Sequence, residues 1–299
     1  MSTWSRIAAS ATIVFLGALV AGSGAMAREI TVVSTAGPMP DVMGALIPIF
    51  ERASGDKVVM KFEGVPQIYG QLREGASIDL VIADEDVIGD LVKRGEMADN
   101  SKIMLSRVDI AVRAGAPKPD IGTADALKAA LIAAKSVAFS QDASGRHFVS
   151  MISRLKLANT LGPKFIIVQD KPVAAAVAAG EAEIGVQQVA ELLPVPGIDI
   201  VGPLPVDMQK IIVYVAGVPA EGSDSEAAKA LVKFFTSAAA VTVLKQKGMD
   251  PADPRPCGIM ICAALATRQA QPGEGIAKAK ATGVYKARPA SIEAARILE

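Results

Sequence analysis

The chain contains little of several residue types on which common functions depend. Aromatic residues make up 4% of the 299 residues, which disfavours sugar-binding and aromatic-cage sites because both are built from stacked rings. The formal net charge is zero, so the sequence predicts no nucleic-acid partner. One histidine, His147, and two cysteines do not supply the ligands of a metal centre, and we expect neither a metal nor a cofactor.

The two cysteines, Cys257 and Cys262, lie near the C-terminus and away from every candidate site. They can pair in an oxidising compartment, but a single pair makes no disulfide framework, so the sequence leaves their state open. The surrounding segment, residues 251–299, is rich in proline, glycine and alanine and has little periodicity. This composition is typical of a peripheral or disordered extension.

The N-terminal segment has the pattern of a secretory signal peptide. The run Ile7–Gly22 is apolar and uncharged, and it follows a short segment with one positive charge. Ala25-Met26-Ala27 then gives the small-x-small pattern of a cleavage site. The run is too short to span a membrane comfortably. We therefore predict that residues 1–27 are removed after Ala27 and that the mature protein is periplasmic.

The mature chain opens with a strand, a polar turn and a helix. Ile30–Val33 is a β-branched run typical of a buried strand, and apolar residues at helical spacing from Val42 to Phe50 predict a helix that ends at Gly55. Pro48 falls inside this helix and is expected to bend it. The turn between them, residues 34–37, carries hydroxyl groups at a helix N-terminus, which is a ready site for a small anion.

The same alternation continues along the chain. Further strands are predicted at residues 57–62, 79–83, 107–113, 136–140, 165–169, 184–186, 198–201 and 211–218, most of them separated by helical patterns. Such alternation predicts an α/β fold with mostly parallel sheets flanked by helices. In these sheets ligands bind beyond the carboxyl ends of the strands.

Several stretches carry a resemblance to a known family. They read VVSTAGPMPDVMGALIPIFERASG, GASIDLVIADEDVIGDLVKRGEM, VAAAVAAGEAEIGVQQVAEL, and DMQKIIVYVAGV followed by ALVKFFTSAAAVTVLKQKGM. In this order they cover nearly all of residues 29–249 and resemble type II periplasmic solute-binding proteins, most closely the molybdate-binding proteins of ABC importers. The resemblance implies two α/β lobes with a ligand cleft between them: lobe one at 28–109 plus 215–250, and lobe two at 110–214.

The resemblance also implies a function. A monomeric protein of this kind closes its lobes on a small anion, molybdate or tungstate, and delivers it to an ABC permease in the inner membrane. On this reading the chain is no enzyme. The residues that match the ligand-binding turns of the family are Ser34, Thr35, Gly64, Gln67, Ser144, Gly145, Arg146 and Gln187.

The matching turns depart from the molybdate pattern. The second turn lacks the usual paired serines and reads Gly64-Val65-Pro66-Gln67, in which the proline has no N–H to donate. The third turn contains Arg146, whose guanidinium suits a carboxylate or a phosphate. The ligand is therefore either an oxyanion or a small organic acid.

Two alternatives to a transport role remain open. One is an exported enzyme on the same scaffold that acts on a carboxylated substrate with His147 as its base, although the sequence offers no obvious second titratable group beside this histidine. The other is a sensory or envelope protein with the same fold. The acidic cluster Asp84–Asp86 is interpreted as a solvated helix start, where carboxylates favour the helix dipole.

Overall fold

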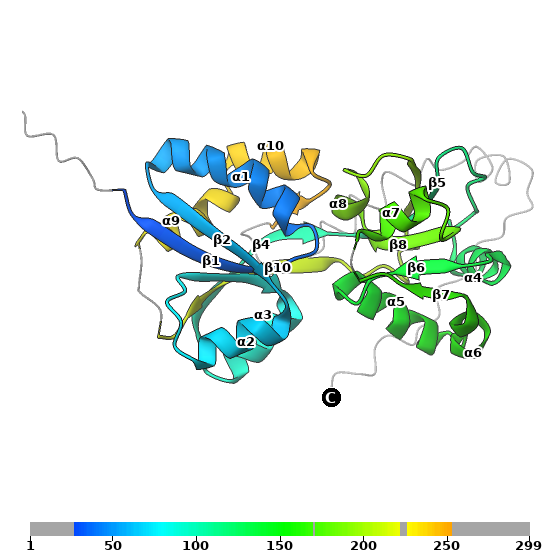
Figure 1. Cartoon of the computed structure of the whole chain (residues 1–299), viewed down its shortest axis with the longest axis horizontal. Coiled ribbons are helices and arrows are strands. Elements are labelled where there is room, and N and C mark those ends of the chain that lie inside the picture. The colour runs from blue at the N-terminus through cyan, green and yellow to red at the C-terminus, as the bar shows by residue number, and fades with distance from the viewer. Residues whose placement is uncertain (1–26, 170, 222–225, 253–299) are drawn as a thin grey trace, which may run out of the picture. The chain divides into compact units, whose positions relative to one another are not determined.

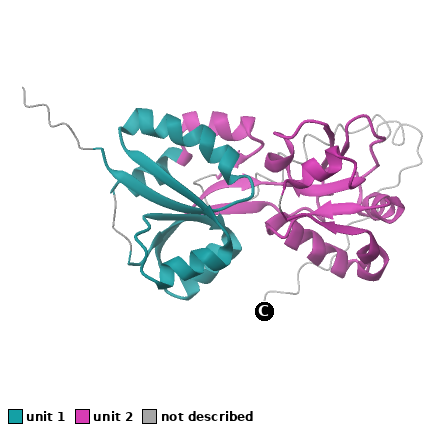
Figure 2. Cartoon of the chain, in the orientation of Figure 1, with its two compact units in different colours: residues 1–100, 216–234 teal, residues 101–215, 235–299 magenta. Residues whose placement is uncertain are grey.

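The computed structural model describes residues 27–169, 171–221 and 226–252. The chain divides into two compact units, coloured in Figure 2. Unit 1 comprises the described residues of 1–100 and 216–234, and unit 2 those of 101–215 and 235–299. The units differ from the expected lobes in the assignment of residues 101–109, 215 and 235–250, so the lobe boundaries stay a prediction. Residues 1–26 of the predicted signal peptide and both cysteines lie outside the described residues.

Unit 1 is built on parallel strand–helix–strand units. Strands β1 (Glu29–Thr35), β2 (Lys57–Glu63) and β3 (Leu80–Asp84) lie in the order β2-β1-β3, and β1 is parallel to both neighbours. The connections from β1 to β2 and from β2 to β3 run in opposite directions across the sheet. Their helices therefore cover opposite faces, as Figure 1 shows for α1 (Met39–Ser54) and α2 (Val65–Arg73).

Unit 2 contains a mixed five-stranded sheet of order β7-β6-β8-β5-β9. Strand β6 (Val137–Phe139) is parallel to β7 (Phe165–Ile167) and β8 (Ile184–Gln188), whereas β5 (Val108–Arg113) is antiparallel to β8 and to β9 (Ile198–Pro203). Helix α5 (Ala143–Arg154) follows β6, and α7 (Val173–Ala178) follows β7 on the opposite face of the sheet (Figure 1).

The remaining elements connect or flank these strands. They are α3 (Glu85–Lys93), β4 (Met97–Ser106), α4 (Ala124–Ala133), α6 (Ala158–Leu161), η1 (Gly162–Lys164), α8 (Val189–Leu192), β10 (Ile212–Pro219), α9 (Glu226–Phe235), α10 (Ala238–Gln246) and β11 (Asp250–Pro251). The six-stranded sheet has the order β11-β4-β10-β3-β1-β2. The predicted α/β fold class, with two sheets flanked by helices, is confirmed; the sheets are mixed, and in unit 2 two of the four strand pairings are parallel and two are antiparallel.

Three aromatic rings fix helix α5 on the sheet of unit 2. Phe148, which is fully buried, lies with its ring centroid 5.2 Å from that of Phe139 and 5.8 Å from that of Phe165. Phe139 and Phe165 themselves meet edge to face at 5.1 Å. Such ring pairs add to the free energy gained by burial. Because Phe148 follows His147 directly, this cluster also sets where the histidine lies.

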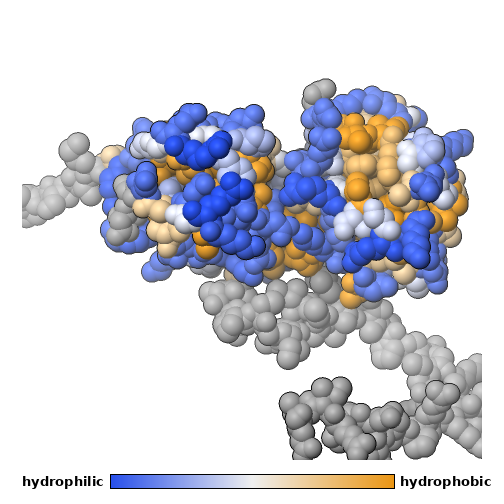
Figure 3. Space-filling view, turned by 90° about the horizontal axis from the view of Figure 1, so that it is seen from below, coloured by the Kyte–Doolittle hydropathy of each residue, from blue (hydrophilic) through white to orange (hydrophobic). Residues whose placement is uncertain are grey.

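Apolar surface is scattered over both units. Exposed apolar side chains include Phe62 in unit 1 and Val149 and Ile167 in unit 2, and Figure 3 shows orange apolar surface between blue hydrophilic residues. Isolated exposed apolar residues are normal and indicate no particular partner. Within the described residues no single helix is long and apolar enough to cross a membrane; helices α9 and α10 reach the required length and composition only as a bent pair.

Candidate functional site

Two turns of unit 1 carry the four site residues predicted there. Ser34 and Thr35 end β1, in register with the end of β2, while Gly64 is the N-cap of α2 and Gln67 lies in its first turn. Parallel strands end at one edge of the sheet, so the four residues are brought together. The Ser34 hydroxyl, which is fully buried, donates to the backbone oxygen of Thr35 at 2.9 Å. A Cβ at Gly64 would lie 2.5 Å from Gln67 Oε1, so the Gln67 side chain folds back over this turn.

Two strands of unit 2 bring the other predicted residues to one edge of its sheet. Phe139 at the end of β6 is the register partner of Val186 in β8, so the turn that leads into α5 begins beside Gln187. Ser144, Gly145 and Arg146 follow in the first turn of α5, and α5 contacts β8. A Cβ at Gly145 would lie 1.6 Å from the backbone oxygen of Ser140, so only glycine allows this close approach.

Two buried polar atoms at this edge have no hydrogen-bond partner among the described residues. They are the Ser144 Oγ and the Gln187 Oε1, on side chains that are 0% and 2% exposed. Asp142, the N-cap residue of α5, makes no side-chain cap hydrogen bond. Buried polar groups are nearly always satisfied, so these two atoms indicate a place where a ligand completes the hydrogen bonding.

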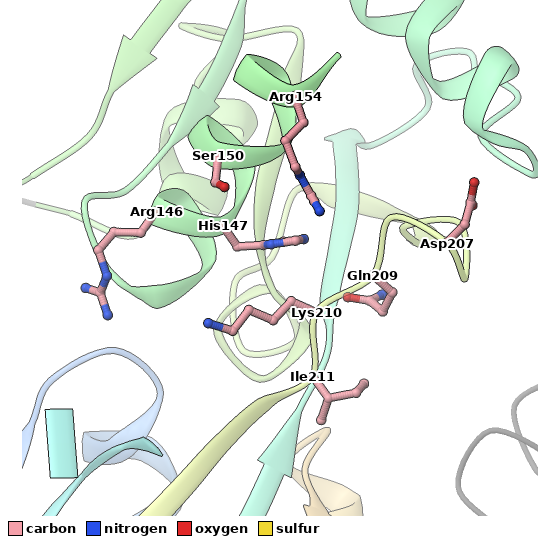
Figure 4. A pocket seen from close by; sticks show the side chains of 8 residues that line it. All are labelled: Arg146, His147, Ser150, Arg154, Asp207, Gln209, Lys210 and Ile211. Carbon is pink, nitrogen blue, oxygen red and sulfur yellow. The ribbon is translucent and has the colours of Figure 1, made fainter. Parts of the chain in front are cut away.

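A basic pocket of about 530 Å³ lies along the same helix (Figure 4). Its lining residues are Arg146, His147, Ser150, Arg154, Asp207, Gln209, Lys210 and Ile211. The first four lie on one face of α5, and the last four belong to the segment between β9 and β10. Three cations against one carboxylate make the pocket attractive to anions. Its volume is that of an ordinary small-molecule site.

His147 is the titratable group at the centre of this pocket. Its Nε2 lies 2.8 Å from the backbone oxygen of Met208, which can only accept, so Nε2 carries the hydrogen and Nδ1 holds the lone pair of the neutral ring. Burial lowers the pKa of His147 below its ordinary value of 6.5, and the positive charges of Lys210 and Arg154 lower it further. Figure 4 shows these two side chains on either side of the ring. The ring is therefore neutral at pH 7 and able to accept a proton.

A second titratable group, the carboxyl group of Glu191, was not predicted from the sequence. Glu191 in α8 is partly buried and accepts hydrogen bonds from Gln187 Nε2 at 2.8 Å and from Gln188 Nε2 at 3.1 Å. Burial, with the negative charge of Asp142 in second place, raises its pKa to about 8. Lys210 and Arg154 were also missed, because isolated basic residues carry no spacing signal. For Glu191 the only available signal was its position one helical turn after Gln187.

The arrangement suits anionic ligands with carboxylate groups. Among the described residues no group of three or more His, Cys, Asp or Glu side chains is placed to hold a metal ion. Arg146, Arg154 and Lys210 offer charge-assisted hydrogen bonds to carboxylates, and a neutral imidazole lies between them. This combination can hold a polycarboxylate and exchange a proton with it.

Comparison with known proteins gives the relatives of the chain. Residues 30–250 match the family model described as bacterial extracellular solute-binding protein. An aconitate isomerase from Pseudomonas sp is 34% identical over 254 residues, which cover 81% of this chain and 97% of that protein. Among solved structures, the Azotobacter vinelandii periplasmic molybdate-binding protein matches with a TM-score of 0.60, 18% identity and coverage of 76% and 100% of the two chains.

A third match is the sulfate-binding protein SubI of Mycobacterium tuberculosis H37Rv, with a TM-score of 0.60, 22% identity and coverage of 76% and 88%. These structural likenesses confirm the predicted periplasmic-binding-protein type II fold. The prediction that the chain is no enzyme is contradicted by the isomerase relative, which is an enzyme on this fold. It was wrong because fold resemblance carries no information on turnover. The chain belongs to the bacterial extracellular solute-binding protein family.

Proposed function

We propose that this protein is an exported isomerase that acts on a small unsaturated polycarboxylate of the aconitate type. The observation that carries the proposal is the 34% identity to an aconitate isomerase along nearly the whole of that protein. The basic pocket with a neutral histidine supports it, because a pure oxyanion binder has no need of a base. The site residues predicted in both units stay part of this proposal as ligand contacts.

Carboxylate recognition in this proposal falls to the cations of unit 2. Arg146 and Arg154 present planar forks that match carboxylates, whereas Lys210 acts as a point charge. Asp207 is the one acidic residue in the lining of the pocket. Its negative charge repels a ligand carboxylate placed next to it. Three carboxylates around one carbon–carbon double bond fit the number of cations and the pocket of about 530 Å³.

Isomerisation of such an acid needs one group that removes and returns a proton. In aconitate the methylene hydrogens are acidic, because the carbanion is delocalised over the adjacent double bond and the carboxylates. His147 Nδ1 takes one of these protons, and the electron pair spreads over three carbons. Return of a proton to the other terminal carbon moves the double bond and permits the change of geometry. The proton is conserved and nothing is oxidised or reduced.

A second candidate function is solute binding without turnover for an ABC permease. The fold of molybdate- and sulfate-binding proteins favours it, as do the signal-peptide pattern and the periplasmic location that it predicts. The altered turn at Gly64–Gln67 argues against molybdate as its ligand. On this reading the anion is a small carboxylate, and lobe closure delivers it to the permease.

The test is to incubate the protein, from Arg28 onward, with cis- or trans-aconitate and to separate the isomers by chromatography over time. Isomerase function predicts approach to the same isomer ratio from both sides. The His147→Gln variant should lose this activity, because glutamine donates to Met208 but cannot act as a base. The matched control Val149→Ala alters an exposed side chain of the same helix. Binding of aconitate without conversion would support the second candidate instead.

A further inference from the structure

The side-chain amide of Gln187 is held by a hydrogen bond at its nitrogen but not at its oxygen. Its Nε2 donates to Glu191 at 2.8 Å, while its Oε1 is buried and has no partner among the described residues. Gln188 is fixed more firmly, because its amide bonds both to Glu191 and to the Tyr214 hydroxyl, at 3.1 Å and 3.0 Å. The Gln187 amide can therefore reverse without losing a partner of its Oε1, whereas both amide atoms of Gln188 lie within hydrogen-bond distance of the Tyr214 hydroxyl.

The charge of Glu191 decides which way the Gln187 amide faces. An ionised carboxylate only accepts, so both glutamine amides must direct their N–H groups toward it, as in this structure. A protonated carboxyl group keeps one oxygen as an acceptor for Gln188 and gains an O–H donor for Gln187. The Gln187 amide then reverses and directs its N–H groups to the side where the buried Oε1, which has no partner among the described residues, now lies.

This side of Gln187 faces the edge of the sheet at which we expect an anion. Gln187 lies beside the turn into α5, and the buried Ser144 hydroxyl, likewise without a partner, begins that helix. An anion there is repelled by the bare Oε1 and attracted by N–H groups. We propose that Glu191 is a proton-dependent positioning residue, which must be protonated for Gln187 to donate to a bound carboxylate. Ligand binding is thereby coupled to uptake of one proton.

The charged groups around Glu191 agree with this coupling. Asp142 at the start of α5 contributes a negative charge that favours the protonated carboxyl. On β5 the buried Asp109, the register partner of Gln187, is neutralised by Arg107 at 2.9 Å. Helix α7 has no ionisable side chain, and the Tyr214 hydroxyl from β10 donates a hydrogen bond to Gln188 Oε1. Lys247 belongs to the segment beside Gly248, which packs against α8, but Asp142 is the charge that shifts the pKa.

The coupling rests on the proposed function only in its choice of ligand, trans-aconitate. Calorimetric titration at pH 9 in two buffers of different ionisation enthalpy measures proton uptake on binding. Since the pKa of Glu191 is about 8, the wild type should take up close to one proton at pH 9, and its Kd should rise about tenfold between pH 7 and pH 9. Glu191→Gln mimics the protonated group, so it should show neither effect and bind at pH 9 as tightly as the wild type at pH 7.

The control is Glu74→Gln, an exposed glutamate in unit 1, which should behave as the wild type does. Gln187→Leu should weaken aconitate binding at pH 7. In the Gln187→Leu background, adding Glu191→Gln should no longer change the affinity at pH 9. Binding with equal proton uptake and equal pH dependence in wild type and Glu191→Gln would overturn the coupling and leave the isomerase proposal intact. No binding or conversion of aconitate by the wild type would overturn both.

Discussion

Helices α1 and α5 begin in comparable places, each after a strand inside its sheet, yet their first turns differ in chemistry. In unit 1 the Ser34 hydroxyl already has an acceptor in the Thr35 backbone, and the nearby turn contributes Gly64 and Gln67 without a charge. In unit 2 the Ser144 hydroxyl has no partner among the described residues, and basic side chains and His147 follow it. The same fold therefore contains one turn whose serine hydroxyl is already hydrogen-bonded within the protein and one turn whose serine hydroxyl has no partner among the described residues until a ligand supplies it.

The largest effect should come from the base in unit 2. His147→Gln is expected to lower the kcat for aconitate isomerisation by about 10²- to 10⁴-fold, the usual contribution of a general base. KM should change little, because the cations remain. Steady-state kinetics measure both constants, with Val149→Ala as the control. A kcat within about threefold of the wild type would remove His147 from the chemistry.

The cations of unit 2 should matter next. Lys210→Met is expected to raise KM about 10- to 100-fold, because a charge-assisted hydrogen bond to a carboxylate is worth about 1.5–3 kcal/mol. The effect should shrink at high salt. Lys128→Met, on helix α4 and outside the lining of the pocket, is the matched control. An unchanged KM would place carboxylate recognition elsewhere.

The pH dependence should follow the lowered pKa of His147. The neutral ring is the active form, so kcat/KM should be constant between pH 6.5 and pH 7, below the pH at which Glu191 ionises, and fall up to tenfold per pH unit below the lowered pKa of His147. The free energy of unfolding should likewise decrease as the pH falls. The folded state binds the proton more weakly than the unfolded chain, so free energy of unfolding is lost as pH falls below 6.5. Urea titrations of wild type and His147→Gln between pH 5 and 7 measure this, and parallel curves would contradict it.

The smallest effects should separate the two serines. Ser144→Ala removes a buried hydroxyl without a partner, so the free energy of unfolding should stay unchanged or rise, while affinity for aconitate falls about tenfold. Ser34→Ala removes a satisfied hydroxyl, so it should cost about 1 kcal/mol of stability and less affinity than Ser144→Ala. Chemical denaturation and calorimetry test both variants. Equal losses of affinity would mean that the two turns contribute alike.

The fold was largely predictable because its core follows simple periodicity. Strands β1, β3 and β8 each contain a short run of apolar or β-branched residues before a polar end, and the helix ends at Gly55 and Gly95 carry left-handed glycines. Strand β4 was missed because its first half is polar and exposed, so neither alternation nor an apolar run marks it. The short helix α8 was missed because four residues are too few to show a period.

The site was less predictable than the fold. The turns with Ser144 and Gln187 stand out because they follow buried strands, and sheet topology alone brings them together. Lys210 belongs to a segment far from α5 in sequence, and its place beside His147 depends on how that segment folds back. The raised pKa of Glu191 depends on burial, which no local pattern reveals.

Proton NMR of aconitate in D₂O with catalytic amounts of the protein tests the central claim most directly. We expect the other geometric isomer to form and deuterium to enter the methylene position, because a proton taken by His147 exchanges with solvent before it returns. His147→Gln should abolish both signals and Val149→Ala neither. Aconitate that raises the Tm of the protein but keeps its geometry and its hydrogens would contradict the account and leave a binding protein.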